Sequence, residues 1–161
     1  MSVPAPGVRL LAAADVAAAA AIAAGLPDYF TADVPGKIEI DAARHGGWVV
    51  TADEAVAGFA IVARKSAHSA EILWMAVDAT RRGRGYGTTL VGHVLDELRR
   101  EGISVVEVKT LDRSASYEPY EATRGFWEGN GFVQVDSVDP WPDWQPGSPA
   151  AIYVAALRAT R

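Results

Sequence analysis

The 161-residue chain contains no cysteine, and this absence removes several kinds of chemistry together. It excludes disulfide bonds, thiolate nucleophiles and metal sites that use cysteine ligands. The three histidines do not compensate, because none has a metal-ligand spacing with another histidine or with an acid on a predicted helix. We therefore expect no bound metal. Because the chain has no cysteine to form disulfide bonds, we also expect it in a reducing compartment, the cytoplasm.

Long hydrophobic runs are also missing. Although 50% of the residues are hydrophobic, no uninterrupted apolar run reaches the roughly 20 residues that a membrane-spanning helix needs. The Ala-rich stretch from Leu10 to Ala24 is similar to the apolar region of a secretion signal. However, Asp15 interrupts it, and Arg9 is the only positively charged residue before it. We expect a soluble protein that is not exported and has no membrane partner.

Positive charge is scarce over the chain as a whole. The 15 Lys and Arg residues stand against 20 Asp and Glu residues and give a net charge of -5. Binding to a nucleic-acid backbone needs a positive surface, so we expect no nucleic-acid partner. A chain of this length fits one domain over residues 1–161.

Glycine and arginine are concentrated in one segment, Arg81-Arg82-Gly83-Arg84-Gly85-Tyr86-Gly87. It lies between the apolar run 72–77 and a helical pattern that starts near Thr88. Glycine lets a ligand approach the backbone, the first turn of a helix has unpaired N–H groups, and arginine adds a forked positive charge. We therefore expect the segment to bind the phosphate groups of a small ligand.

Two common phosphate motifs fit this segment poorly. Its glycines follow G-x-G-x-G from Gly83 to Gly87, whereas the dinucleotide fingerprint is G-x-G-x-x-G. Residues 85–89 contain no lysine, which a P-loop uses to reach the terminal phosphates. The sequence thus disfavours a dinucleotide, ATP or GTP.

The order of the predicted elements indicates an α+β fold. Apolar and β-branched runs predict strands, while helical spacing, as in Leu90, Val94 and Leu98, predicts helices. We expect strands at residues 8–11, 48–51, 57–62, 70–77, 104–111, 132–138 and 151–157, and helices at residues 15–25, 36–45, 88–100 and 119–128. Strands and helices do not alternate regularly, so a doubly wound nucleotide-binding fold is not expected.

The sequence contains two short motifs, one after a predicted strand and one at the end of the last predicted helix. The first is R-x-x-G-x-G, present as Arg82, Gly85 and Gly87 directly after an apolar strand. The second is Phe-Trp-Glu-Gly-Asn-Gly-Phe at residues 126–132. With the element order, these motifs resemble the GNAT superfamily of acyl-CoA-dependent N-acetyltransferases over most of the chain, and residues 153–157 resemble its closing strand. The resemblance implies a central mixed, mostly antiparallel sheet of about seven strands flanked by about four helices.

The resemblance also implies the cofactor, acetyl-CoA, and much of its site. It assigns the CoA pyrophosphate to Arg82, Gly83, Arg84, Gly85, Tyr86, Gly87 and Thr88. It assigns the pantetheine arm to main-chain groups of Met75, Ala76 and Val77, with the Met75 N–H as the donor to the thioester oxygen. Ala79 replaces a proline of the family, a change in the turn that we do not expect to abolish binding. A tight turn with solvated arginines is the alternative interpretation of the loop.

The last predicted helix departs from the family pattern. Many members place a tyrosine, which protonates the leaving thiolate, where this chain has Trp127, and an indole N–H is no usable acid near neutral pH. Tyr120 and Thr123 replace the family's Asn and Ala, and the spacing puts all three residues on one cofactor-facing side. Core packing is the alternative for this stripe. Tyr120 or Tyr117 could supply the proton, or the thiolate could leave unassisted.

Glu71 is the candidate general base. It stands early on the strand before the loop, where some family members have a carboxylate that draws a proton from the amine through water. Alternation along a strand places Glu71, Leu73 and Met75 on one side. A carboxylate paired with a nearby Lys or Arg is the alternative. The weaker candidates are His45, His68 and His93.

The resemblance places the acceptor pocket beside the segment that follows the first helix. Tyr29, Phe30 and Thr31 are the candidate wall residues there. The loop 140–149 would lie opposite, with Trp141 and Trp144 as an aromatic lining. Tryptophans next to prolines also fix a loop to its own surface, which is the alternative role for both.

The sequence as a whole predicts an enzyme that moves an acetyl group from acetyl-CoA directly to an amine of a small molecule or peptide. Without cysteine, a thiol acyl-enzyme is excluded. The net acidic charge favours a cationic acceptor, and dimers are common in the family. The alternatives are a CoA-binding sensor or interaction module without catalysis, and transfer of an acyl group other than acetyl, against which the bulk of Trp127 and Tyr120 argues.

Overall fold

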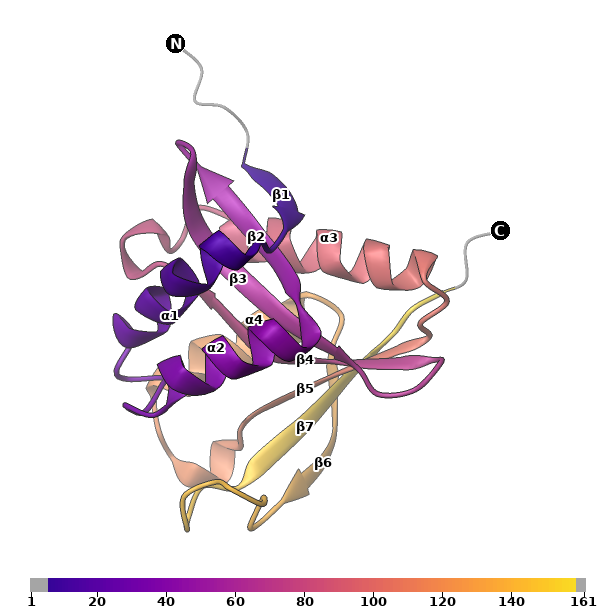
Figure 1. Ribbon diagram of the computed structural model, residues 1–161. Coiled ribbons are helices and arrows are strands. Elements are labelled where there is room, and N and C mark those ends of the chain that lie inside the picture. The colour runs from indigo at the N-terminus through magenta and orange to yellow at the C-terminus, as the bar shows by residue number, and fades with distance from the viewer. Residues whose placement is uncertain (1–5, 159–161) are drawn as a thin grey trace.

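The computed structural model describes residues 6–158, which contain a seven-stranded sheet with the order β1-β2-β3-β4-β5-β7-β6 (Figure 1). The strands are β1 (Gly7–Leu10), β2 (Gly47–Ala52), β3 (Ala55–Arg64), β4 (Ser69–Val77), β5 (Val105–Leu111), β6 (Val133–Val138) and β7 (Ala150–Ala156). Neighbouring strands are antiparallel except β4 and β5, which are parallel. The predicted mixed, mostly antiparallel sheet is confirmed.

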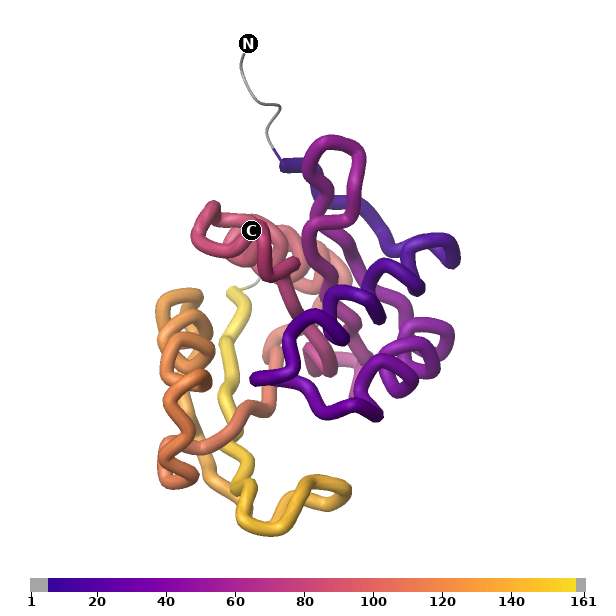
Figure 2. The backbone as a smooth tube through the Cα atoms, turned by 90° about the vertical axis from the view of Figure 1, so that its left-hand side faces the viewer, coloured from indigo at the N-terminus to yellow at the C-terminus, as the bar shows by residue number. Residues whose placement is uncertain are grey.

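Within the same residues, four α-helices cover the two faces of this sheet: α1 (Val16–Ala24), α2 (Val34–His45), α3 (Tyr86–Arg100) and α4 (Pro119–Gly129). Short 3-10 turns precede three of them: η1 (Ala13–Asp15), η2 (Ala79–Arg81) and η3 (Arg113–Ala115). α1 and α2 lie together on one face of the sheet, and α3 and α4 lie on the other (Figures 1 and 2). Each pair of helices therefore closes its own hydrophobic core against the same sheet.

α3 has an amphipathic sequence, and packing of its apolar face fixes its position after the glycine-arginine loop. Leu90, Val91, Val94 and Leu98 are all buried against the sheet. Burial of each such side chain contributes about 1.5 to 3 kcal/mol. The glycine-arginine loop thus leads into an element whose position is fixed by packing.

β4 and β5 pair over only three residues each. Ser69–Glu71 pairs with Val105–Glu107, and beyond these residues β4 stays with β3 while β5 stays with β7. Beyond Glu71 and Glu107, β4 and β5 therefore do not hydrogen-bond to each other. The N–H and C=O groups on their facing edges are available to other partners. The sheet opens at the carboxyl end of β4, just before the glycine-arginine loop.

A β-bulge at Leu73 changes which side chains of β4 share a face. The pairing of β4 with β3 skips Leu73, which is thus an extra residue. Ile72 and Met75 pack with the core of α3 and α4, whereas Leu73 and Trp74 pack with the core of α1 and α2. The predicted placement of Glu71, Leu73 and Met75 on one side is wrong, because the bulge resets the alternation before Met75.

The remaining predicted elements are present with small shifts of their ends. α2 begins at Val34 because Pro35 fits the first turn of a helix. α3 begins at Tyr86, directly after Gly85, whose φ of 84° is left-handed. The glycine-arginine loop therefore supplies the first residues of α3 itself.

Candidate active site

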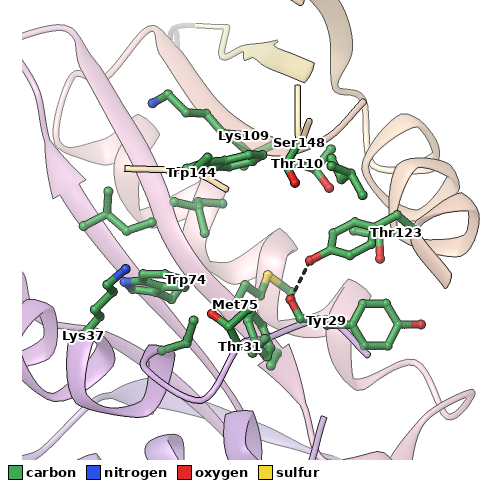
Figure 3. Close-up of a pocket in the computed structure, with 18 of the residues that line it drawn as sticks. Tyr29, Thr31, Lys37, Trp74, Met75, Lys109, Thr110, Thr123, Trp144 and Ser148 are labelled. Carbon is green, nitrogen blue, oxygen red and sulfur yellow. Dashed lines mark hydrogen bonds between the residues drawn. The ribbon is translucent and has the colours of Figure 1, made fainter. Parts of the chain in front are cut away.

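Two neighbouring cavities meet beside the carboxyl end of β4. The larger, about 790 Å³, is lined by the diverging halves of β4 and β5, and the smaller, about 380 Å³, by the glycine-arginine loop and α4. Figure 3 shows a pocket with Met75 at its centre and Thr123 on the α4 side. The residues that line both cavities are Tyr29, Met75, Ala76, Arg82, Thr123 and Trp127. Two ligands, one in each cavity, would meet at this shared wall.

The smaller cavity brings together most of the residues that the sequence assigned to the cofactor. These are Met75, Ala76, Val77, Arg82, Gly83, Gly85, Tyr86, Gly87, Thr88, Thr123 and Trp127. Arg84 differs, since it is exposed and lines neither cavity. Arg81, which belongs to the segment expected to bind phosphate, also lines the smaller cavity. Sequence reasoning missed Ala122 and Phe126, which line it as well. Phe126 could have been found, because it is the first residue of the aromatic pair in the second motif.

The start of α3 leaves backbone donors available to a ligand. Gly83 and Gly85 have φ values of 76° and 84°, which glycine adopts without strain. The N-cap residue Gly85 offers no side-chain acceptor to the N–H groups of the first turn. A Cβ on Gly87 would lie 3.1 Å from the Phe126 ring, so glycine there allows α3 and α4 to approach closely. These N–H groups and the helix dipole favour an anion in the smaller cavity.

Two arginines of the loop add positive charge to that cavity in different ways. Arg81 lies 3.5 Å from the Asp53 carboxylate, which offsets part of its charge. The Arg82 guanidinium carbon lies 4.6 Å from the centroid of the Tyr29 ring, a cation–π contact. Arg81 thus contacts a carboxylate, whereas Arg82 contacts an aromatic ring.

The position of Trp127 is compatible with both of the roles that the sequence left open, and the cofactor-facing role stays a prediction. Its ring is 7% exposed and packs edge-on against Phe126 at 5.1 Å and Phe132 at 5.0 Å between centroids. It belongs to the core of α3 and α4 and also lines both cavities. The indole is therefore a rigid part of the shared wall.

Tyr120 lies in the larger cavity with its hydroxyl already engaged. The hydroxyl donates to the Tyr29 carbonyl oxygen at 2.6 Å, the bond drawn in Figure 3. Burial, together with the nearby Tyr117 and Tyr29, raises the pKa of Tyr120 to about 12. Proton transfer from such a phenol to a thiolate, whose pKa is near 8.5, is uphill. The acid role of Tyr120 stays a prediction, and it requires this hydrogen bond to open.

Glu71 lines the larger cavity as a buried carboxylate between two lysines. Its Oε2 accepts a hydrogen bond from Lys109 Nζ at 2.8 Å, and its Oε1 lies 3.6 Å from Lys65 Nζ. Lys109 Nζ also lies 3.1 Å from a carboxylate oxygen of Glu107. Burial opposes the charged form of Lys109, but the bonds to Glu71 and Glu107 outweigh it and raise its pKa. The ion-paired alternative is thus present, and the base role of Glu71 stays a prediction.

The larger cavity has aromatic walls on opposite sides. All five residues that the sequence connected with the acceptor pocket line it, namely Tyr29, Phe30, Thr31, Trp141 and Trp144. Trp141 also caps Lys109, whose Nζ lies 4.5 Å from its ring centroid.

Sequence reasoning missed Trp74 as part of this wall. Its Nε1 donates to Asp41 at 2.7 Å, and its ring lies edge-on to Phe30. The bulge at Leu73 turns Trp74 toward this side, and an unpaired extra residue leaves no sequence pattern to recognise.

Residues 6–158 contain neither a metal-ligand cluster nor a membrane-spanning helix. No group of three or more acidic or histidine side chains in that range is arranged to hold a metal ion. The helices of the described part are also too short or too polar to cross a membrane.

Comparison with known proteins identifies the family. The model of the Acetyltransferase (GNAT) family matches residues 17–126. No curated protein matches the sequence.

Solved structures share the fold along nearly the whole chain. A putative GNAT acetyltransferase from Desulfovibrio desulfuricans is 20% identical with a TM-score of 0.79, over 96% of this chain and 100% of that one. The ribosomal-protein-S18-alanine N-acetyltransferase of Escherichia coli is 19% identical with a TM-score of 0.74, over 98% and 97%. YncA of Salmonella typhimurium, a putative acetyltransferase solved with acetyl-CoA, is 18% identical with a TM-score of 0.72, over 98% and 96%. By its family match and its fold, the chain belongs to the GNAT family of acetyltransferases.

Proposed function

We propose that the protein transfers an acetyl group from acetyl-CoA directly to the amine of a small molecule or peptide. The observation that carries this proposal is the pair of cavities with one common wall at Met75, Thr123 and Trp127. The smaller cavity has the donors that an anionic pyrophosphate needs, and the larger has room for a separate acceptor. Direct transfer between two bound substrates requires this kind of junction.

On the donor side, residues 82–88 bind the pyrophosphate, and the thioester reaches the shared wall. There the Met75 N–H donates to the thioester oxygen, which gains negative charge as the amine attacks. This role is compatible with the open edge of β4, because β5 has diverged from β4 before Met75. Of the three arginines in the loop, Arg82 is the proposed main contact, since Arg84 lies outside both cavities.

On the acceptor side, the amine nitrogen attacks the carbonyl carbon. A C–N bond forms, the C–S bond breaks and its electron pair leaves on sulfur. Glu71 takes the amine proton through water, for which its place in the wall of the larger cavity is suited. The sequence offers no cysteine for a thiol acyl-enzyme, which favours this direct route.

A second candidate function is a CoA-binding sensor or interaction module without turnover. It is favoured by one observation, the lack of a ready acid beside the leaving sulfur. Trp127 has no acidic proton near neutral pH, and the Tyr120 hydroxyl is bonded to a main-chain carbonyl. A thiolate can leave without an acid, however, so catalysis is our preferred function.

A thiol-release assay with acetyl-CoA and a panel of amino acids, polyamines and peptides separates the two functions. We expect free CoA to form at a rate that depends on the amine, with one acetylated amine per thiol released. Tight CoA binding by calorimetry without turnover on any amine would support the sensor instead.

We also propose that the enzyme acts in the cytoplasm and as a homodimer. The lack of cysteine suits a reducing compartment. Light scattering of the purified protein tests the dimer, and a mass equal to one chain would contradict it.

A further inference from the structure

We propose that Tyr29 is a positioning residue that holds Arg82 ready for the CoA pyrophosphate. This inference rests on the proposed role of residues 82–88 in cofactor binding. Tyr29 lies in the segment between α1 and α2, which the sequence connected only with the acceptor. It lines both cavities and is therefore also next to the cofactor site.

The contact between the two side chains leaves the donors of Arg82 free. The guanidinium carbon lies over the Tyr29 ring, 4.6 Å from its centroid, which is a cation–π contact. A guanidinium carries five N–H donors in one plane, which suits the oxygens of a phosphate. Among residues 6–158, Arg82 has no carboxylate or carbonyl partner that would compete with a phosphate. A restrained arginine with free donors loses less side-chain freedom when an anion binds.

Tyr29 can position Arg82 only if it is itself held in place, and contacts with Tyr117 and Tyr120 do this. The Tyr120 hydroxyl donates to the Tyr29 carbonyl at 2.6 Å, and the two rings lie 5.4 Å apart. The Tyr117 hydroxyl donates to the neighbouring Asp28 carbonyl at 2.9 Å. Two hydroxyls, one from α4 and one from a residue just before it, thus hold the backbone that carries the Tyr29 ring.

The other two arginines of the loop lack such an arrangement. Arg81 faces the Asp53 carboxylate at 3.5 Å, so its charge is partly offset. Arg84 is exposed and lies outside the smaller cavity. Arg82 is exposed, as Arg84 is, but it lines the smaller cavity and is the arginine of this loop that contacts an aromatic ring.

The experiment compares CoA with pantetheine, which lacks the pyrophosphate and the nucleotide. Dissociation constants of both ligands are measured by calorimetry for the wild type and for Tyr29→Leu, Tyr29→Phe and Arg82→Gln. Tyr29→Phe is the matched control, because it keeps the ring and the main-chain carbonyl. Thermal unfolding of each variant checks that the fold is retained.

We expect Tyr29→Leu to weaken CoA binding about three- to tenfold and to leave pantetheine binding unchanged. Tyr29→Phe should retain the wild-type ratio of the two constants. In an Arg82→Gln background, Tyr29→Leu should have no further effect on CoA, since the ring acts through Arg82.

Two different results would overturn two different claims. If Arg82→Gln leaves the ratio of the CoA to the pantetheine dissociation constant unchanged, the proposed role of the Arg82 side chain in binding the pyrophosphate fails. If Arg82→Gln raises the ratio of the CoA to the pantetheine dissociation constant but Tyr29→Leu does not, or if Tyr29→Leu weakens both ligands equally, Tyr29 does not position Arg82. Binding is measured without turnover, so neither result depends on the identity of the acceptor.

Discussion

Both carboxylate oxygens of Glu71 face ammonium groups, and this limits how the residue can act as a base. Lys109 Nζ lies at 2.8 Å and Lys65 Nζ at 3.6 Å. A proton arriving at Glu71 through water competes with Lys109 for the same carboxylate, so proton uptake requires their bond to lengthen. Lys109 also forms an ion pair with Glu107, so its positive charge remains balanced while Glu71 holds a proton.

Replacing Glu71 separates its proposed base role from its ion pair. We expect Glu71→Gln to lower kcat/KM about a hundredfold or more, as loss of a general base does. Glu107→Gln is the control, because it removes a partner of Lys109 but does not line either cavity. Its kcat/KM should fall less than about threefold. A pH-rate profile of Glu71→Gln that matched the wild type, or an equal loss in both variants, would remove Glu71 from the mechanism.

A matched pair of tyrosines tests the acid. Tyr120→Phe and Tyr117→Phe each remove one hydroxyl that holds the segment 28–29. Loss of either bond should reduce the free energy of unfolding by about 1 kcal/mol. If Tyr120 is the acid, only Tyr120→Phe lowers kcat, whereas Trp127→Phe retains most of it. Equal changes of kcat in the two tyrosine variants would mean that both hydroxyls act by positioning alone.

At the scale of elements, the sequence predicts those helices and strands whose apolar residues recur at regular spacing. The apolar spacing in α3 and the R-x-x-G-x-G loop were readable because helices and helix starts have local signals. The bulge at Leu73 has none, and it moved Met75 off the side predicted for it and brought Trp74 into the acceptor wall. Likewise, the contact of Arg82 with Tyr29 joins residues from separate elements, which no spacing along the chain encodes.

Two glycines of α3 test the packing between α3 and α4. A Cβ at Gly87 would lie 3.1 Å from the Phe126 ring, whereas a Cβ at Gly92 would contact nothing within 4 Å. We expect Gly92→Ala to raise the free energy of unfolding by about 0.5 to 1 kcal/mol, from helix propensity alone. Gly87→Ala should gain less than this or lose stability, and it should weaken CoA binding. Calorimetry and thermal unfolding check both, and identical behaviour of the two variants would contradict the close approach.

At the scale of the whole molecule, the positive loop is an exception on an acidic protein. The net charge is -5, and the lining of the larger cavity includes five acidic and four basic residues, namely Asp28, Asp33, Asp41, Glu71 and Asp143, and Lys37, Lys65, Arg82 and Lys109. The cofactor is an anion and the loop attracts it locally, while the surrounding field disfavours anions elsewhere. An acceptor that brings extra positive charge therefore meets a favourable field at the second cavity.

The salt dependence of turnover tests this division of charge. We expect kcat/KM for a diamine to fall about three- to tenfold between roughly 10 mM and 500 mM salt, because ions screen its attraction to the acidic cavity. The control is an amine of similar length that carries a carboxylate, for which kcat/KM should stay constant or rise. Both series are measured at saturating acetyl-CoA, so that screening at the loop does not contribute. Parallel salt curves for the two acceptors would show that the field of the protein does not select the acceptor, and the choice would then depend on contacts with the aromatic walls.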